Sequence, residues 1–223
     1  MDVGTRTPPT GRNPGRRQEI LDATRSLFDE SGARDTQIED IARAVGINRA
    51  IIYRHFSSKD ELFAESVVTY LGELRSELVA AVAVSDDPVR QLDGLTDAMI
   101  LFGLTHPAFV DCALALVRQP GAQLIESVGT PTLVRLGEAM WSCLTSVVAT
   151  LEAGVAQGVF DVEDPVLLAN LYYTQALGMT SLAALQWSVH STTAGDPAVA
   201  DVQVDLIRHY ARLSAQGQAR GAR

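Results

Sequence analysis

Apolar residues recur with a helical period along most of the chain, whereas the alternation that is typical of strands is scarce. The first apolar stripe runs from Ile20 to Phe28 and ends at Ser31-Gly32, a common helix stop. Farther along, a polar residue followed by proline marks each helix start, because proline is tolerated in the first helical turn. These pairs are Asp87-Pro88, His106-Pro107, Thr130-Pro131, Asp164-Pro165 and Asp196-Pro197. The pattern therefore predicts an all-α fold of about nine helices.

Residues 36–56 hold two short helical stripes that are separated by a glycine. Thr36, with Glu39 three residues later, has the form of a capping box, so Thr36 is predicted as the N-cap of the first short helix. Gly46 suits the left-handed conformation that ends a helix, and Asn48 is a suitable N-cap for the next one. Two short helices around such a turn predict a helix-turn-helix.

The second of these short helices has a side that fits DNA. Ile52 and Phe56 lie four residues apart, so we expect both to face the core. Ser58 is predicted to cap a longer fourth helix of about residues 58–84, which joins this unit to the rest of the chain. The side of the second helix that is left for a major groove carries Arg49, Ala50, Tyr53 and Arg54.

The stretch from Arg16 to Phe63 resembles the N-terminal domain of the TetR (tetracycline repressor-like) family. The resemblance implies a three-helix helix-turn-helix domain followed by a larger helical domain that binds an effector and dimerises. It further implies a repressor that binds a palindromic operator in double-stranded DNA as a homodimer and is released by a small molecule. The matching positions are Ile20-Leu21-Asp22-Ala23, Leu27-Phe28, Gly32, Ile38, Ile41-Ala42, Gly46, Tyr53, His55-Phe56 and Lys59-Asp60-Glu61-Leu62.

The resemblance also implies roles for single residues. Those expected to contact phosphates, which fix register without reading sequence, are Thr36, Tyr53, His55 and Lys59. Those expected to face base edges are Arg49, Ala50, Ile51 and Arg54. Gln37 and Asn48 complete the predicted DNA-binding surface, although capping is the simpler role for Asn48. Ile51 departs from the small or hydroxylated residue that is common in the family, which leaves the base preference open.

Charge is distributed unevenly along the chain. The net charge is −9, but residues 1–60 carry ten Lys+Arg and nine Asp+Glu, hence +1, which leaves −10 for the remainder. An acidic body with a more basic end is compatible with DNA binding through that end, although a solvated basic tail has the same pattern. We expect a flexible arm at residues 1–14, a DNA-binding domain at 15–60, and an effector-binding and dimerisation domain at 61–223.

Residues 166–195 carry no charged side chain, and such a segment is long enough to span a membrane. Its polar residues and acidic flanks argue against a span. A helix in water that is apolar on most sides must be covered on most sides, so we expect a partner copy, with a central helix of a monomer as the alternative. The family resemblance places the dimer interface on the last two long helices, about residues 165–189 and 198–213. The predicted interface residues are Gly178, Leu182, Leu185 and Leu206.

Methionine and aromatic residues are frequent in the second domain, where the family has an effector cavity. Such side chains line apolar pockets well, although ordinary core packing explains each of them equally. Arg118 and Arg135 can form an ion pair with an anionic group on a ligand, or they can be solvated surface residues. The predicted effector-binding residues are Met99, Phe102, Phe109, Met140, Trp141, Tyr172 and Met179.

The sequence does not favour an enzyme or a metal protein. Cys112 and Cys143 lie in apolar stretches without a CxxC or Cys/His spacing, so we expect neither a disulfide nor a zinc site, and a cytoplasmic location. The histidines are scattered, and no nucleophile motif or spaced carboxylate pair is recognisable. We predict no cofactor and no catalytic residue. The alternative function is a DNA-binding protein without an effector, which is gated by a protein partner or organises the chromosome.

Overall fold

The computed structural model describes residues 14–33, 35–193 and 197–221, together with their side chains except at residues 14 and 184–203. This part of the chain is all-α, as predicted, and forms ten helices. Of the predicted arm, residues 1–13 lie outside the described residues. The helices are α1 (Pro14–Ser31), α2 (Ile38–Val45), α3 (Arg49–His55), α4 (Lys59–Val82), α5 (Pro88–Thr105), α6 (Pro107–Arg118), α7 (Gly121–Val128), α8 (Thr130–Ala156), α9 (Pro165–Thr193) and α10 (Pro197–Ala219).

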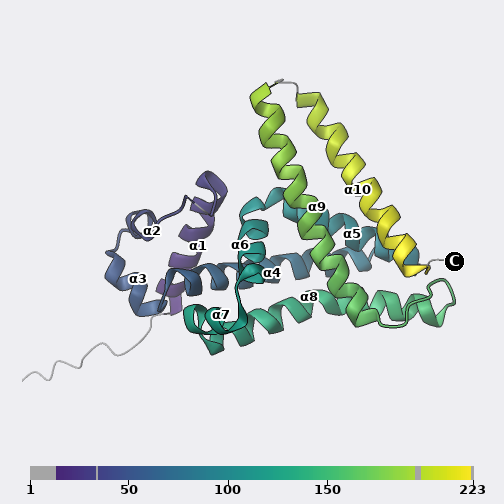
Figure 1. Cartoon of the computed structure of the whole chain (residues 1–223). Coiled ribbons are helices and arrows are strands. Elements are labelled where there is room, and N and C mark those ends of the chain that lie inside the picture. The colour runs from purple at the N-terminus through teal and green to yellow at the C-terminus, as the bar shows by residue number, and fades with distance from the viewer. Residues whose placement is uncertain (1–13, 34, 194–196, 222–223) are drawn as a thin grey trace, which may run out of the picture.

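Helices α1, α2 and α3 form a small recognition unit at one end of the molecule (Figure 1). Gly46 ends α2 in the left-handed conformation, at φ 72°, as predicted. The predicted caps are confirmed: Asn48 Oδ1 accepts a hydrogen bond from the Ile51 amide, and Ser58 Oγ accepts one from the Glu61 amide. The core of the unit is completed by one residue of α4 and consists of Ile20, Leu21, Ile38, Ile41, Ala42, Ile52, Phe56 and Leu62.

The predicted capping box at Thr36 is wrong. The N-cap of α2 is Gln37, whose side chain makes no capping hydrogen bond. Thr36 is buried instead, and its hydroxyl donates to the carbonyl oxygen of Gly32 at 2.8 Å. Glu39 pairs with Arg49 of α3 at 3.2 Å. Contacts with the preceding and following helices thus replace the local cap.

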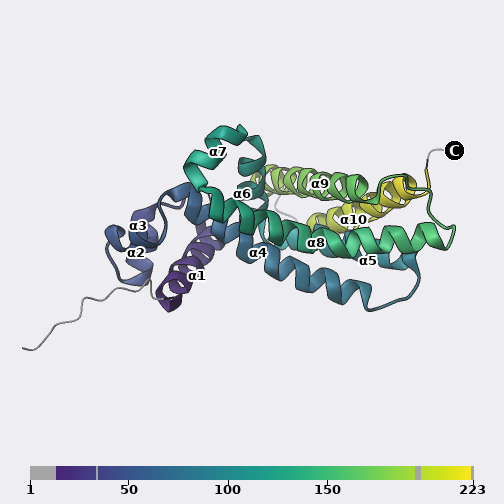
Figure 2. The ribbon, with the colours of Figure 1, turned by 90° about the horizontal axis from the view of Figure 1, so that it is seen from below.

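The body consists of α4 to α10. Helices α4 and α8 run side by side along its length, and α5 lies beside α4 (Figure 2). Helices α9 and α10 form an antiparallel pair (Figure 1). Two arginines of α10, Arg208 and Arg212, each reach Asp97 of α5 at 2.8 Å, which anchors this pair to the body. The five helices α4, α5, α6, α8 and α9 supply most of the large side chains of one continuous core.

The proline-marked helix starts are confirmed at α5, α6, α8, α9 and α10. Helix α7 was missed, which is why ten helices are found where about nine were predicted. It follows Gln119-Pro120, a polar-proline pair of the same form, and ends at Gly129 with φ 83°. The same signal therefore marks this short helix too.

Among the described residues, α8 is long and apolar enough to cross a membrane by length and composition alone, and the bent pair α5–α6 passes the same test if it is counted as one span. Such a helix is weak evidence, because the core helix of a soluble protein passes too. Helix α8 packs against α4, α5 and α9 and supplies Leu144, Val147 and Leu151 to the core of the body.

Candidate DNA-binding and effector sites

Helix α3 presents a polar face to the outside of the recognition unit. Ile52 and Phe56 are buried in the core, as predicted, and this fixes which side of the helix faces outward. Tyr53 is 47% exposed, although tyrosine is a large side chain with substantial apolar area. Arg49 is also exposed, and its guanidinium lies 3.2 Å from the Glu39 carboxylate of α2. The exposed residues of this face are Arg49, Ala50, Tyr53 and Arg54.

The other predicted DNA contacts differ in accessibility. Gln37 and Asn48 are exposed, and Ile51 is half-buried. Thr36 and His55 are only 2% and 9% exposed, so little of either side chain is open to a phosphate in this conformation. Burial of Thr36 follows from its hydrogen bond to Gly32, which closes the turn after α1.

Lys59 is the first residue of α4 and the single lysine of the chain. Its ammonium donates to the carbonyl oxygen of Thr36 at 2.8 Å and lies 5.0 Å from the ring centroid of Phe63. The side chain is half-buried, and its hydrogen bond to Thr36 holds the turn before α2.

Comparisons with known proteins agree with this geometry. Residues 20–66 match the family described as bacterial regulatory proteins, tetR family. The chain is 30% identical to the HTH-type transcriptional repressor KstR2 of Rhodococcus jostii (strain RHA1), over 81% of this chain and 85% of the relative. The chain belongs to the TetR family.

Other TetR-family proteins are similar over most of their length. The HTH-type transcriptional regulator BetI of Agrobacterium fabrum is 25% identical over 80% of this chain and 87% of its own. The crystal structure of the regulator PfmR from Thermus thermophilus superposes with a TM-score of 0.57 at 25% identity, covering 92% of this chain and 98% of PfmR. This TetR-family chain is a DNA-binding transcriptional regulator and not an enzyme.

The predicted effector-binding residues lie at several places in the body. Met99, Tyr172 and Met179 line a cavity of about 20 Å³ between α5, α8, α9 and α10. Met99 also lines a second cavity of about 10 Å³, where it meets Phe109. Phe102 packs edge to face against Phe109 at 5.4 Å between ring centroids, within the core. The two remaining residues lie on α8, where Met140 packs against the core and Trp141 is exposed.

A larger hollow of about 240 Å³ lies where the recognition unit meets the body. It is lined by apolar residues such as Phe63 and Leu116, and by charged residues of both signs. Arg118 lines it, but Arg135 does not belong to it. The charged residues of this junction hollow are Lys59, Asp60, Asp111 and Arg118.

The two cysteines of the body, Cys112 and Cys143, are both buried thiols. Burial raises the pKa of the Cys112 thiol to about 12 and that of the Cys143 thiol to about 11, so both stay protonated at neutral pH. Cys143 donates to the carbonyl oxygen of Leu71 at 3.1 Å. Neither cysteine has the deprotonated sulfur that nucleophilic chemistry needs.

Helices α9 and α10 expose the apolar residues that the dimer prediction requires. Leu182 and Leu206 are 56% and 48% exposed, and Gly178 has open space beside it. The side chain of Leu185 lies outside the described residues. Further exposed apolar residues with helical spacing on the same two helices are Leu167, Leu171, Tyr210 and Leu213.

Proposed function

We propose that this TetR-family chain is a repressor that binds a palindromic operator as a homodimer and is released by a small, mainly apolar effector in the cytoplasm. The observation that carries the DNA-binding part is the outward face of α3, where Arg49, Tyr53 and Arg54 are exposed while Ile52 and Phe56 fix the helix from behind. A short helix of this kind fits the major groove with its exposed side chains toward base edges.

Arg49 is proposed to read a base. Its partner in the free protein, Glu39, is exposed, so the guanidinium can exchange this ion pair for the O6 and N7 atoms of a guanine. Replacing Arg49 with Ala should change the preferred base at one position of each half-site, with a loss of about 1–3 kcal/mol. Binding is measured on a set of operators in which each base pair is varied in turn.

The matched control is Arg43→Ala. Arg43 is a similarly exposed arginine of α2 that pairs with Asp40, so this variant loses the same charge from the same unit. It should weaken binding to all sequences alike, or not at all. Tyr53→Ala should behave like the control, since a phosphate contact carries no base information. The base-reading role of Arg49 is wrong if the Arg49 variant keeps the wild-type base profile.

The dimer is proposed to form through the exposed apolar side chains of α9 and α10. Exposed apolar side chains that recur along two neighbouring helices favour association. Leu182→Arg should place a charge in that interface and yield monomers or aggregates, whereas Val134→Arg, at a similarly exposed position on α8, should leave the dimer intact. Sedimentation at micromolar concentration distinguishes these outcomes, and a wild-type monomer would contradict the proposal.

The effector is proposed to enter the body between α5, α8 and α9. The cavity lined by Met99, Tyr172 and Met179 now holds little more than one water molecule, whereas a small-molecule site needs roughly 300–1,000 Å³. These helices must therefore separate when a ligand binds. Such a ligand prefers the opened conformation, and this difference in affinity is what shifts the protein away from DNA.

The test is a thermal-shift screen for a ligand, followed by titration of that ligand with and without operator. By linkage, a ligand that weakens DNA binding binds more weakly to the DNA-bound dimer. Equal affinity in the two titrations would contradict release by an effector. The close packing of the body would then favour the alternative, a DNA-binding protein gated by a protein partner, and a genome-wide map with many scattered sites would favour chromosome organisation.

A further inference from the structure

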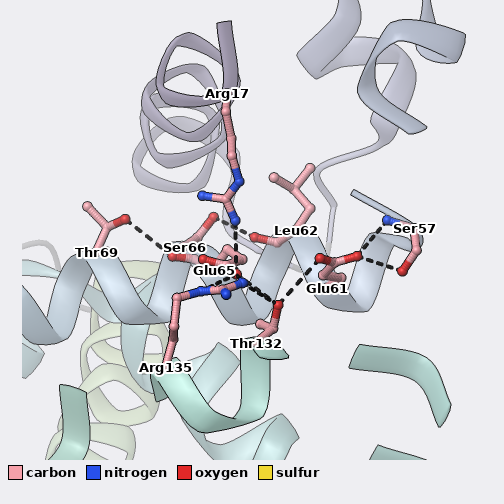
Figure 3. Close-up of polar contacts among 9 residues, drawn as sticks. All are labelled: Arg17, Ser57, Glu61, Leu62, Glu65, Ser66, Thr69, Thr132 and Arg135. Atoms are coloured by element: carbon pink, nitrogen blue, oxygen red, sulfur yellow. Dashed lines mark hydrogen bonds and ion pairs between the residues drawn. The ribbon is translucent and has the colours of Figure 1, made fainter. Parts of the chain in front are cut away.

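A buried carboxylate on α4 joins the recognition unit to the body (Figure 3). Glu65 lies in the second turn of α4 and is only 3% exposed. Its Oε1 atom lies 2.9 Å from Nη2 of Arg17 on α1. The same atom accepts hydrogen bonds from Thr132 Oγ1 at 2.8 Å and from Arg135 Nε at 3.0 Å, and it also contacts Arg135 Nη2. Three helices, α1, α4 and α8, therefore meet at one oxygen atom.

A second ion pair repeats this link between α1 and α4. Arg25 donates from Nη1 and Nη2 to the two carboxylate oxygens of Glu73 at 2.5 and 2.6 Å. Arg17 and Arg25 lie two helical turns apart on α1, and Glu65 and Glu73 lie two turns apart on α4. The guanidinium of Arg25 also lies 4.2 Å from the ring centroid of Tyr70. The two pairs thus fix the register of α1 along α4.

Arg17 reaches the core of the recognition unit as well. Its guanidinium carbon lies 4.8 Å from the ring centroid of Phe56, the residue that follows α3. Arg17 therefore lies between the aromatic side chain that anchors α3 and the carboxylate that is bound to α8. The contacts of Phe56 with Arg17, of Arg17 with Glu65 and of Glu65 with Arg135 thus form a short chain from the end of α3 to α8.

A second set of hydrogen bonds, through Glu61, links the turn between α3 and α4 to α8. Glu61 Oε2 accepts hydrogen bonds from the amide and the hydroxyl of Ser57, both at 2.6 Å. The other oxygen of Glu61 lies 3.4 Å from the hydroxyl of Thr132, which also binds Glu65 (Figure 3). Glu65 and Glu61 of α4 thereby link both ends of the recognition unit to Thr132 in the first turn of α8.

We propose that Glu65 is a positioning residue for operator binding. By holding Arg17 and Arg135 at one oxygen, it fixes the angle between the recognition unit and the body. In the dimer this angle sets the distance between the two recognition helices, and hence the half-site spacing that the protein accepts. The inference rests on the proposed function, which supplies the dimer and the palindrome.

The test compares Arg17→Met with Arg16→Met. Methionine keeps the unbranched apolar stem, and both variants lose one positive charge from the same turn of α1. Arg16 pairs with Glu19 within α1, so its loss leaves the link to α4 intact. Affinity is measured for an operator of native spacing and for one with a base pair inserted at its centre, which moves one half-site by about 3.4 Å and turns it by about a tenth of a helical turn.

Wild type and Arg16→Met should discriminate strongly between the two operators. For Arg17→Met, the ratio of the affinities for the native and the lengthened operator should fall about tenfold. The main reason is that this variant should bind the lengthened operator better than wild type does. Arg135→Met breaks the same junction on the α8 side and should have the same effect. Thermal melting followed by circular dichroism shows whether each variant folds. If Arg17→Met does not fold, Arg135→Met is used in its place.

Two results would overturn the proposal, and they can be told apart. If wild type discriminates and the folded Arg17 and Arg135 variants discriminate equally well, Glu65 has a structural role only. If wild type itself does not discriminate, the palindrome-binding dimer fails, and the positioning role of Glu65 fails with it. If the Arg17 and Arg135 variants melt at a lower temperature but keep the wild-type spacing preference, Glu65 likewise has a structural role only.

Discussion

The recognition unit and the body use their buried side chains in different ways. The core of the recognition unit has eight buried residues, and two of them, Ile52 and Phe56, hold α3 so that its functional side chains point outward. The body has a far larger core, which includes four of the seven predicted effector-binding residues, Met99, Phe102, Phe109 and Tyr172. The proposed DNA-binding face of the first region is therefore exposed in the free protein, whereas the proposed effector site of the second region would open only through a conformational change. Mutations should separate the two regions.

The largest effect is expected from Phe56→Ala. Loss of a fully buried aromatic ring costs about 3–5 kcal/mol, and the small core of the recognition unit has few other contacts to offset it. DNA binding should be lost while the helices of the body still melt cooperatively in circular dichroism. Phe102→Ala, the corresponding change in the body core, should lower the main melting transition instead. Normal operator affinity of the Phe56 variant would contradict this division.

Glu65→Gln tests the junction between the regions. Burial alone would raise the pKa of Glu65, but hydrogen bonds from Arg135, Arg17 and Thr132 outweigh it and hold the pKa below its ordinary value of 4.5. Two further carboxylates act on this cluster: Glu61, which faces it through Thr132, and Glu138, whose charge acts on Arg135. The charged hydrogen bonds of Glu65 should contribute about 1.5–3 kcal/mol at neutral pH.

The sign of the pH dependence follows from the lowered pKa. The stabilisation is complete above the unfolded-state pKa of Glu65 and is lost as the pH falls through the lower folded-state value. Urea unfolding at a series of pH values should therefore give wild type a higher free energy of unfolding than Glu65→Gln at neutral pH. The difference between the two free energies should shrink in acid. A difference that does not shrink below about pH 4 would argue that the carboxylate is not ion-paired.

Gly154→Ala should destabilise the body. A Cβ atom at this position of α8 would lie 1.9 Å from a ring carbon of Phe160, so the ring must move, at a cost of about 1–3 kcal/mol. Gly137→Ala in the same helix is the control, because nothing lies within 4 Å of its added carbon. This second change should stabilise α8 by about 0.5–1 kcal/mol. Shifts of the same sign in chemical unfolding would show that Phe160 does not pack as described.

The smallest effect is expected at the start of α3. Asn48→Ala removes the acceptor for the Ile51 amide and should cost about 1 kcal/mol. Asn48→Asp keeps a capping oxygen and should restore most of that stability, while its negative charge weakens DNA binding. Equal stability of the two variants would point to a role for Asn48 in contact with DNA alone.

The features that the sequence predicts well are short-range. The apolar stripes, the glycine at position 46, the caps at Asn48 and Ser58, and the proline-marked helix starts all depend on residues within a few positions of one another. These local signals were sufficient for the helix-turn-helix and for the outward face of α3. The missed helix α7 carries the same kind of signal at Gln119-Pro120.

The features that were missed depend on distant residues. Glu65 meets Arg135 across 70 positions, and Arg25 meets Glu73 across 48, so no local pattern marks these pairs. Arg135 was considered as a ligand contact, yet it binds Glu65. The N-cap of α2 was misplaced for a local reason, because the hydroxyl of Thr36 bonds back to Gly32, four positions earlier. The closed packing around Met99 follows from the assembly of four helices.

Selection of bound sequences from random duplex DNA tests the central claim most directly. The wild-type chain, at physiological salt, should enrich one inverted repeat whose half-sites are centred about one helical turn, or a multiple of it, apart. This result is predicted because two copies of α3, related by a twofold axis, would read the same bases on each side. Enrichment of a single unrepeated site, or of no defined sequence, would contradict a dimeric operator-binding repressor.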